Sequence, residues 1–416
     1  MRRVHHRRLL QVLAVGWLAR AAFILLSSPR ARSTDVFSWI TVAHELRAGA
    51  NPYETTTFLN WPPLWLVVIW LLDHVSSALG ISFFLTLRLF LIAVESGVVV
   101  LLYSFLARVA PDQARRIVIV GISLNPIAIL LVCQHGNFDV LVGLTCLAGA
   151  LAVGRYSRTR DAIMWLVGAL ALGLGALAKT VPLLLAPLLA RGARLNGWPA
   201  RWIALALFVG PALLGDAVIL VLAPHAVVHN VLFYRSQPGS YGITGIARAI
   251  GVGAIGNGYS RVLFPLVLLA FEVAAVVMLS RRDLDTRRTL LLAALILFAI
   301  PAIGSGYAPQ YAYWWLPLLV ATYPLFDRGW RVLLLAFYVI AAATYIVEYG
   351  LLIDHGAFLI VNDHFKPGAF LNDAKLRFSH PTWLTVLRLP LFLASLAVIA
   401  GGVVRLLPAR EPVSPR

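Results

Sequence analysis

Long runs of apolar residues alternate with short polar segments along most of the chain. The first run covers residues 9–28, about the 20 apolar residues that one membrane-crossing helix needs. Later runs are also continuous rather than alternating with a period of two, which favours helices over the strands of a membrane barrel. The pattern predicts an all-α polytopic membrane protein in which residues 1–416 form a single integral-membrane domain.

Composition agrees with this class and narrows the meaning of the charge. The chain is 60% hydrophobic and 13% charged, with a mean hydropathy of +0.83, which is more apolar than a soluble core requires. The net charge of +17 would suit a nucleic-acid partner, but the arginines lie in short clusters between apolar runs. We therefore interpret them as topology signals and expect no nucleic acid. Cys133 and Cys146 lie inside apolar runs and are interpreted as packing residues.

The arginine clusters allow the crossings to be counted. Basic segments are expected to face the cytoplasm, like the N-terminus; they are residues 108–116, 154–160, 191–201, 281–288, 326–331 and the tail after 405. Alternating crossings place a tight outer turn near Lys179 and outside loops at 29–82, 134–138, 223–261, 304–310 and 350–382. The count predicts about 12 transmembrane helices in a cell membrane, with both termini cytoplasmic.

Two segments do not fit a simple count. Residues 62–80 are long enough to cross, but counting them would place the arginines of 108–116 outside. We therefore expect 62–80 to lie on the membrane or dip into it. Residues 161–190 leave only about 15 residues for each of two crossings, which is short for a membrane helix.

The first outside loop, 29–82, contains a predicted helix of its own. Ser33 or Thr34 can cap it, and Gly49 ends it. Its apolar residues recur at spacings of three and four, which predicts an amphipathic helix on the membrane surface; they are Val36, Trp39, Ile40, Ala43 and Leu46.

Asp35 in the first turn of this helix has two explanations. An acid at that place is favoured by the helix dipole and needs no further role. A carboxylate held at the lipid boundary can also act as a general base toward a substrate hydroxyl.

Three stretches resemble the GT-C superfamily of integral-membrane glycosyltransferases. The first joins Asp35, a helix ending in RAGANPY, and Trp61 before a proline pair. The others are LNPIAILLVCQHGNFDVL (124–141) and SGYAPQYAYWWLPLL (305–319), which are similar to the family's second outside loop and to a late segment. The resemblance is greatest to bacterial polyprenyl-phosphate-mannose mannosyltransferases and the first GPI mannosyltransferase, and covers most of residues 10–190 and 300–320.

The resemblance implies roles for particular residues. Asp35 would be the catalytic base, and the residues expected to contact donor or acceptor, or to position the base, are Trp61, His135, Asn137, Asp139, Gln310 and Tyr311. The aromatic residues of 305–319 are also explained by an aromatic belt at the membrane surface. Many relatives carry two acids in the second loop, but this chain has only Asp139 there.

Cationic residues of the predicted outside face are candidates for binding a lipid phosphate. Arg235 could grip a phosphate with two N–H groups or anchor to lipid headgroups, and Lys179 could also extend to the membrane surface. Residues 354–377 concentrate His364 and Lys366. That segment is alternatively a solvated loop.

Metal binding is not expected. His135 and Asp139 are four residues apart and could share a helix face, and HAVVH (225–229) has a similar spacing. Neither pair has an evident third ligand, so we expect polar or structural roles and no cofactor.

The resemblance implies transfer of a sugar, mannose by preference, from a polyprenyl phosphate to a lipid or glycan acceptor on the extracytoplasmic face. The reaction is expected to invert the anomeric centre without a metal, and the enzyme to act as a monomer. No Gly-rich nucleotide-phosphate loop is evident. One alternative is a twelve-helix secondary transporter, which the mid-span acids Glu95, Asp216 and Glu272 keep open. Another is a lipid-diphosphate-sugar polymerase or ligase.

Overall fold

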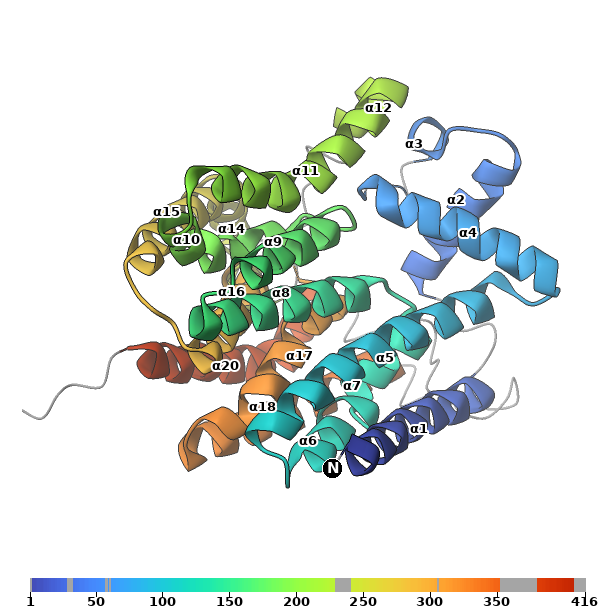
Figure 1. The fold of residues 1–416 in the computed structure, drawn as a ribbon. Coiled ribbons are helices and arrows are strands. Elements are labelled where there is room, and N and C mark those ends of the chain that lie inside the picture. The colour runs from blue at the N-terminus through green and yellow to red at the C-terminus, as the bar shows by residue number, and fades with distance from the viewer. Residues whose placement is uncertain are drawn as a thin grey trace, which may run out of the picture.

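The fold is built from helices (Figure 1). The structure is a computed structural model of the chain that describes residues 2–27, 33–56, 59, 61–228, 241–304, 307–351 and 380–407. In these ranges every regular element is helical, so the predicted all-α class is confirmed.

Seven helices of the described residues are long and apolar enough to cross a membrane. They are α1 (Arg2–Leu26), α5 (Phe83–Val109), α8 (Asp139–Thr159), α11 (Trp198–Leu222), α16 (Thr286–Ile303), α18 (Arg328–Leu351) and α20 (Pro381–Leu406). Their length and composition indicate a membrane-embedded protein.

An eighth candidate span is broken in the middle. Its halves, Ala114–Ser123 and Pro126–His135, are bent by 46°. Pro126 lacks the N–H that a continuous helix would use, and the Asn125 side chain accepts the Ile127 N–H to begin the second half. The elements are α6 (Ala114–Val118), η1 (Ile119–Ser123), α7 (Pro126–Ile129) and η2 (Leu130–His135).

The other four predicted crossings fall on shorter helices. These are α9 (Ala162–Ala176), η3 (Val181–Leu185) with α10 (Ala186–Leu195), α15 (Phe264–Ser280), and α17 (Ala312–Thr322) followed by η7 (Tyr323–Leu325). Residues 161–190 do form a hairpin with Lys179 in its turn. The count of about 12 crossings stays a prediction, because these helices fall below the length or hydropathy of the seven long ones.

Ion pairs bring several of the arginine-bearing segments together. Arg160 and Arg191 both donate to Asp283, at 2.7 and 2.9 Å. Arg405 donates to Asp327 at 2.7 Å. The Asp283 contacts join segments 154–160, 191–201 and 281–288, and the Asp327 contact joins 326–331 to the segment at 405. Such contacts are expected of loops at one end of the bundle. The side of the membrane that they face stays a prediction.

The first predicted outside loop folds as α2 (Thr34–Arg47), α3 (Pro52–Thr55) and α4 (Pro63–Leu79), at the upper right of Figure 1. The Ser33 hydroxyl accepts the Val36 N–H to cap α2, and Gly49 has a left-handed φ of 74° after its last turn. The predicted bounds of this helix are therefore confirmed.

Aromatic packing and an ion pair hold α2 against α4. The ring centroids of Trp39 and Trp65 lie 4.9 Å apart, edge to face. Arg47 at the end of α2 binds the buried carboxylate of Asp73 in α4. Helix α4 is a single 17-residue apolar helix. That it lies on the membrane or dips into it, without crossing, stays a prediction.

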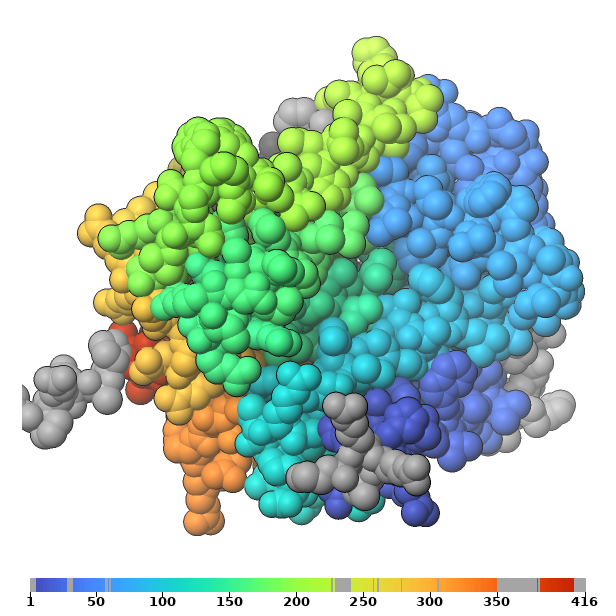
Figure 2. All heavy atoms as spheres, viewed as in Figure 1, coloured from blue at the N-terminus to red at the C-terminus, as the bar shows by residue number. Residues whose placement is uncertain are grey.

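The predicted outside loop 223–261 holds, in its described part, α12 (Pro224–Val227), α13 (Gly242–Ala249), α14 (Gly253–Gly258) and η5 (Tyr259–Leu263). Near its start, Asn51 Nδ2 donates to the carbonyl of Leu222 at 3.3 Å. Figure 2 shows the α2–α4 segment next to the end of α11 at the top of the molecule.

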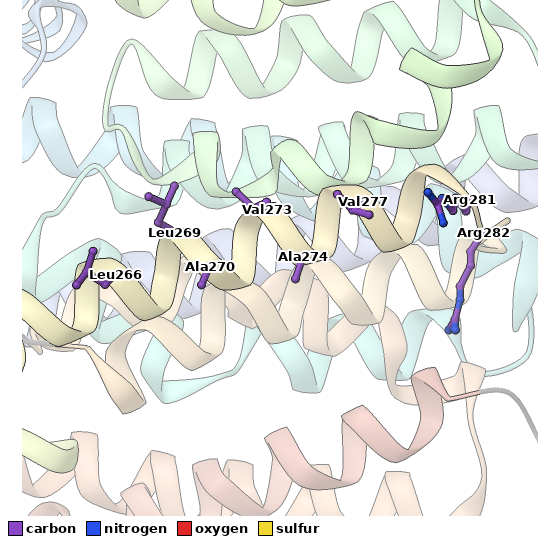
Figure 3. A pocket seen from close by; sticks show the side chains of 8 residues that line it. All are labelled: Leu266, Leu269, Ala270, Val273, Ala274, Val277, Arg281 and Arg282. Atoms are coloured by element: carbon purple, nitrogen blue, oxygen red, sulfur yellow. The ribbon is translucent and has the colours of Figure 1, made fainter.

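Helix α15 carries an open apolar groove of about 810 Å³ (Figure 3). Arg281 and Arg282 close one end of it. The rest of its lining is apolar, as expected of a helix that faces lipid; the lining residues are Leu266, Leu269, Ala270, Val273, Ala274 and Val277.

Candidate functional site

Asp35 is the centre of a polar cluster assembled from distant parts of the chain. Its Oδ2 atom lies 2.6 Å from Asn137 Nδ2, 3.0 Å from His135 Nε2 and 3.4 Å from Gln310 Nε2. Oδ1 has no hydrogen-bond partner among the described residues, and the side chain is 22% exposed. One carboxylate oxygen is therefore held, while the other is available to a ligand.

The surroundings of Asp35 keep it ionised near neutral pH. Burial is the largest single influence and raises the pKa of the carboxyl group. The hydrogen bond and charge interaction with His135, the amide of Asn137 and the charge of Lys179 act the other way. Together they hold the pKa of Asp35 below its ordinary value, so the group can accept a proton at neutral pH.

The second-loop residues reach this cluster through a sharp turn. Helix η2 ends at His135, and Gly136 has a left-handed φ of 65°. A Cβ at Gly136 would lie 2.8 Å from a Val36 methyl group, so no larger residue fits there without a shift. The Asn137 Oδ1 atom then accepts the N–H of Asp139 at 2.8 Å, where α8 begins.

The expectation that His135 and Asp139 share a helix face is wrong. Gly136 ends one helix before Asp139 starts the next, so the four-residue spacing has no helical meaning. The two side chains have different partners. His135 contacts Asp35, whereas Asp139 contacts Lys179.

Lys179 and Asp139 form a buried ion pair beside the cluster. Lys179 Nζ lies 2.9 and 3.2 Å from the two carboxylate oxygens of Asp139, which is 1% exposed. The ammonium also lies 5.0 Å from the ring centre of Tyr311 and 4.9 Å from that of Trp314, within range of cation–π attraction. Burial is the largest single influence and lowers the pKa of Lys179, but the interactions with Asp139, Tyr311 and Asp35 together outweigh it, and the net pKa is raised.

Trp61 lies in an aromatic cluster next to the site. Its ring centroid is 5.9 Å from that of Phe138, edge to face, and 6.1 Å from that of Trp39. Phe138 in turn lies under the Lys179 ammonium at 5.5 Å. Trp61 therefore supports the wall of the site, without a hydrogen bond to Asp35.

The structure thus brings most of the predicted site residues together. A chain of direct contacts joins seven of them: Asp35, His135, Asn137, Asp139, Lys179, Gln310 and Tyr311. The other three candidates lie outside the described residues: Arg235, His364 and Lys366.

Sequence reasoning missed Tyr349. This tyrosine of α18 is fully buried, and its hydroxyl lies 2.8 Å from His135 Nδ1. It stands in an apolar run without a motif, so only its polar end could have drawn attention to it. Trp314 was interpreted as part of an aromatic belt, but its ring stacks on that of Tyr311 at 4.1 Å.

Glu95 belongs to a separate network inside the bundle. It accepts hydrogen bonds from Arg20 at 2.8 Å and from Tyr313 at 2.6 Å. Arg20 also donates to the carbonyls of Ile122 and Ser123, beside the break in the neighbouring span. Pro126 has no N–H for the carbonyl of Ile122, which accepts the Asn125 N–H at 3.2 Å in its place. This network satisfies the broken helix and gives Glu95 a structural role.

The other two mid-span acids are less completely paired. Asp216 Oδ1 and Glu272 Oε1 are buried and have no partner among the described residues. As whole residues, Asp216 on α11 and Glu272 on α15 are half-buried.

No group of three or more His, Cys, Asp or Glu side chains that could hold a metal occurs within the described ranges, which omit 229–240 and 352–379. Of the predicted HAVVH pair, His225 lies in α12 and His229 outside the described residues. Comparison of the chain with protein-family models and with curated proteins found no match.

Proposed function

We propose that the protein is a GT-C-type glycosyltransferase that transfers a sugar from a polyprenyl phosphate to a lipid or glycan hydroxyl. Mannose is the sugar proposed for the donor. One observation carries the proposal: the three stretches that resemble this superfamily meet at one carboxylate. Asp35 of the first stretch is bonded by His135 and Asn137 of the second and by Gln310 of the third.

The chemistry follows from the two unlike oxygens of Asp35. Oδ1 takes the proton of the acceptor hydroxyl while that oxygen attacks the anomeric carbon of the donor. A new carbon–oxygen bond forms, the bond from that carbon to the phosphate oxygen breaks, and polyprenyl phosphate leaves with the electron pair. Because base and leaving group lie on opposite sides of the carbon, a β-linked donor gives an α-linked product.

A cation near the leaving phosphate would stabilise the charge that develops there. Lys179 is a candidate for this role, because its charge acts on Asp35 and its side chain is 18% exposed. An ammonium has three N–H groups, and Asp139 is the acceptor of only two contacts. Arg235 and Lys366 remain further candidates, and with such cations the reaction needs no metal.

The reaction is proposed to take place on the extracytoplasmic face of a cell membrane. The arginine-bearing segments would then lie in the cytoplasm with both termini, and the chain would act as a monomer. A polyprenyl phosphate would place its sugar at the headgroup level, where α2, the helix that carries Asp35, is predicted to lie.

The direct test is transfer by the purified protein in detergent or lipid. Polyprenyl-phosphate-mannose is supplied with a lipid or glycan acceptor, without added metal and with a chelator present. Transfer under these conditions supports the proposal, and other polyprenyl-phosphate sugars define the donor.

Two outcomes would support the alternatives instead. Ion-coupled solute uptake without any transfer would favour a transporter, in which Asp216 and Glu272 become the residues of interest. Transfer from lipid-diphosphate sugars alone would favour a polymerase or ligase.

A further inference from the structure

Three polar groups form a continuous line from the bundle interior to the site. Tyr349 of α18 lies 2.8 Å from His135 Nδ1, and His135 Nε2 lies 3.0 Å from Asp35 Oδ2. Exposure rises along the line, from 0% for Tyr349 to 7% for His135, while the Asp35 side chain is 22% exposed. Only the last group in the line is accessible to a substrate.

The ionised state of Asp35 determines which nitrogen of His135 carries the hydrogen between the two groups. An ionised carboxylate only accepts hydrogen bonds, so Nε2 of His135 must carry the hydrogen that points at Asp35. Nδ1 then bonds the Tyr349 hydroxyl in either protonation state of the ring: the lone pair of neutral histidine accepts the O–H, and the N–H of the imidazolium donates to the oxygen. The Tyr349 side chain that carries this hydroxyl is fully buried.

The opposite arrangement would be unfavourable. With the hydrogen on Nδ1, the lone pair of Nε2 would face the negative Oδ2 atom of Asp35. The carboxylate would then lose one of the donors that hold Oδ2, and the direction of Oδ1 would be less well defined. Second groups that orient the ring of a functional histidine act in this way in metal and hydrolase sites.

We propose that Tyr349 is a positioning residue for the transfer reaction, which acts through His135 to hold Asp35 Oδ2 and so aims Oδ1 at the acceptor hydroxyl. The inference rests on the proposed function for the identity of the base. It adds a residue of α18, 314 positions after Asp35 in the sequence, that touches neither substrate.

Other charged and titratable groups also face Asp35 and are kept constant in the test. Lys179, from the turn after α9, and Asp139, at the start of α8, both act on its charge. Tyr311 lies beyond Lys179. Comparing Tyr349→Phe with and without His135 separates the part of its effect that passes through His135 from any other part.

The first arm of the experiment is a double-mutant cycle on the transfer rate. Tyr349→Phe should lower kcat about 3- to 10-fold, the effect of losing one neutral hydrogen bond, with little change in donor KM. In a His135→Ala background the same substitution should have no further effect, because the connection is already cut. Tyr241→Phe removes another buried hydroxyl, which bonds Ser395 at 2.8 Å, and should leave kcat unchanged.

The second arm needs no activity. The carboxyl stretch of Asp35 is followed by infrared titration, as the difference between each protein and its Asp35→Asn variant. Because the donors to Oδ2 lower the pKa of Asp35, weakening one of them should move the titration of Tyr349→Phe to higher pH. Tyr241→Phe should titrate like the wild type.

The two arms separate the two claims. A wild-type protein without transfer activity would refute the proposed function, while the infrared shift would still show that Tyr349 acts on Asp35. An unshifted titration in Tyr349→Phe, or an equal loss of kcat with and without His135, would overturn the positioning role and leave Tyr349 as a packing residue.

Discussion

At the scale of single residues, the pairing of Lys179 with Asp139 links the candidate site to the stability of the fold. Asp139 is almost fully buried, and Lys179 is its ionic partner. Lys179→Met would leave a buried carboxylate uncompensated, which costs about 3–5 kcal/mol of unfolding free energy. The double variant Lys179→Met with Asp139→Leu removes both charges and should recover most of that loss.

The measurement is the thermal unfolding midpoint of the two single variants and the double variant in the same detergent. If the double variant is as unstable as the sum of the singles, the two side chains do not depend on each other and the pair has no structural role.

The sequence predicted which residues lie around Asp35 only where those residues belong to a motif. His135, Asn137 and Gln310 stand in stretches that resemble a family, and they do meet Asp35. Tyr349 could not be anticipated, because its contact with His135 spans 214 residues of sequence and depends on how α18 packs. Pairings of this kind are set by the tertiary fold, which local spacing does not encode.

At the scale of elements, Ser33 connects the start of α2 to the end of η2. Its hydroxyl accepts the Val36 N–H at 3.1 Å and donates to the His135 carbonyl at 2.6 Å. Ser33→Ala should cost about 1–3 kcal/mol, because it removes a helix cap and leaves a buried carbonyl unpaired. Transfer should fall as well, since Asp35 and His135 lose their common anchor.

Ser82→Ala is the matched control, because Ser82 caps α5 through the Leu85 N–H and makes no bond to the site. It should lose cap stability alone, while Ser33→Thr should restore both bonds of Ser33. If the Ser33 and Ser82 alanine variants transfer sugar at the same rate, Ser33 is only a helix cap and does not anchor the site.

Close packing of α8 on α17 gives a second prediction at this scale. A Cβ on Gly143 would lie 2.4 Å from the Tyr313 carbonyl oxygen, whereas one on Gly210 of α11 meets nothing within 4 Å. Gly143→Ala should therefore lower the unfolding midpoint and, by displacing α17, reduce transfer. Gly210→Ala should stabilise by about 0.5–1 kcal/mol, the usual helix preference for alanine. A neutral Gly143→Ala would mean that the two helices are not in contact.

Elements were predictable where local chemistry defines their ends. Ser33 and Gly49 bound α2 as the sequence indicated. The face-sharing of His135 and Asp139 failed, because Gly136 adopts a left-handed conformation that a spacing rule ignores. The hydrophobic pattern predicted that the elements are helices and roughly how long they are. It did not determine the number of crossings, because α9, α10 and α17 are too short for their length alone to show whether they span a membrane.

At the scale of the whole molecule, the predicted topology requires that the two ends of the helix bundle differ chemically. The ion pairs of Asp283 and Asp327 gather arginine-bearing loops, whereas the cluster around Asp35 gathers polar residues from the remaining ones. Cysteines introduced at Ser157 and Ser280 should therefore react with an impermeant reagent only from the cytoplasmic side. A cysteine at Ser82 should react only from outside.

Labelling in sealed cells and in inverted vesicles provides the measurement. Reaction of the Ser82 and Ser280 positions from the same side would contradict the predicted path of the chain, and reaction of Ser157 from outside would mean that residues 62–80 cross the membrane.

The central claim is that Asp35 is the base, and Asp35→Asn tests it most directly. The amide oxygen of asparagine can still accept from Asn137 and Gln310, so the fold and the unfolding midpoint should be retained, but the proton acceptor is lost. Transfer from polyprenyl-phosphate-mannose should fall by about 10²–10⁴ with donor binding nearly unchanged, while Asp283→Asn, at an exposed acid, keeps the wild-type rate. Transfer by Asp35→Asn at close to the wild-type rate would contradict the account and leave Asp35 as a helix-terminal acid.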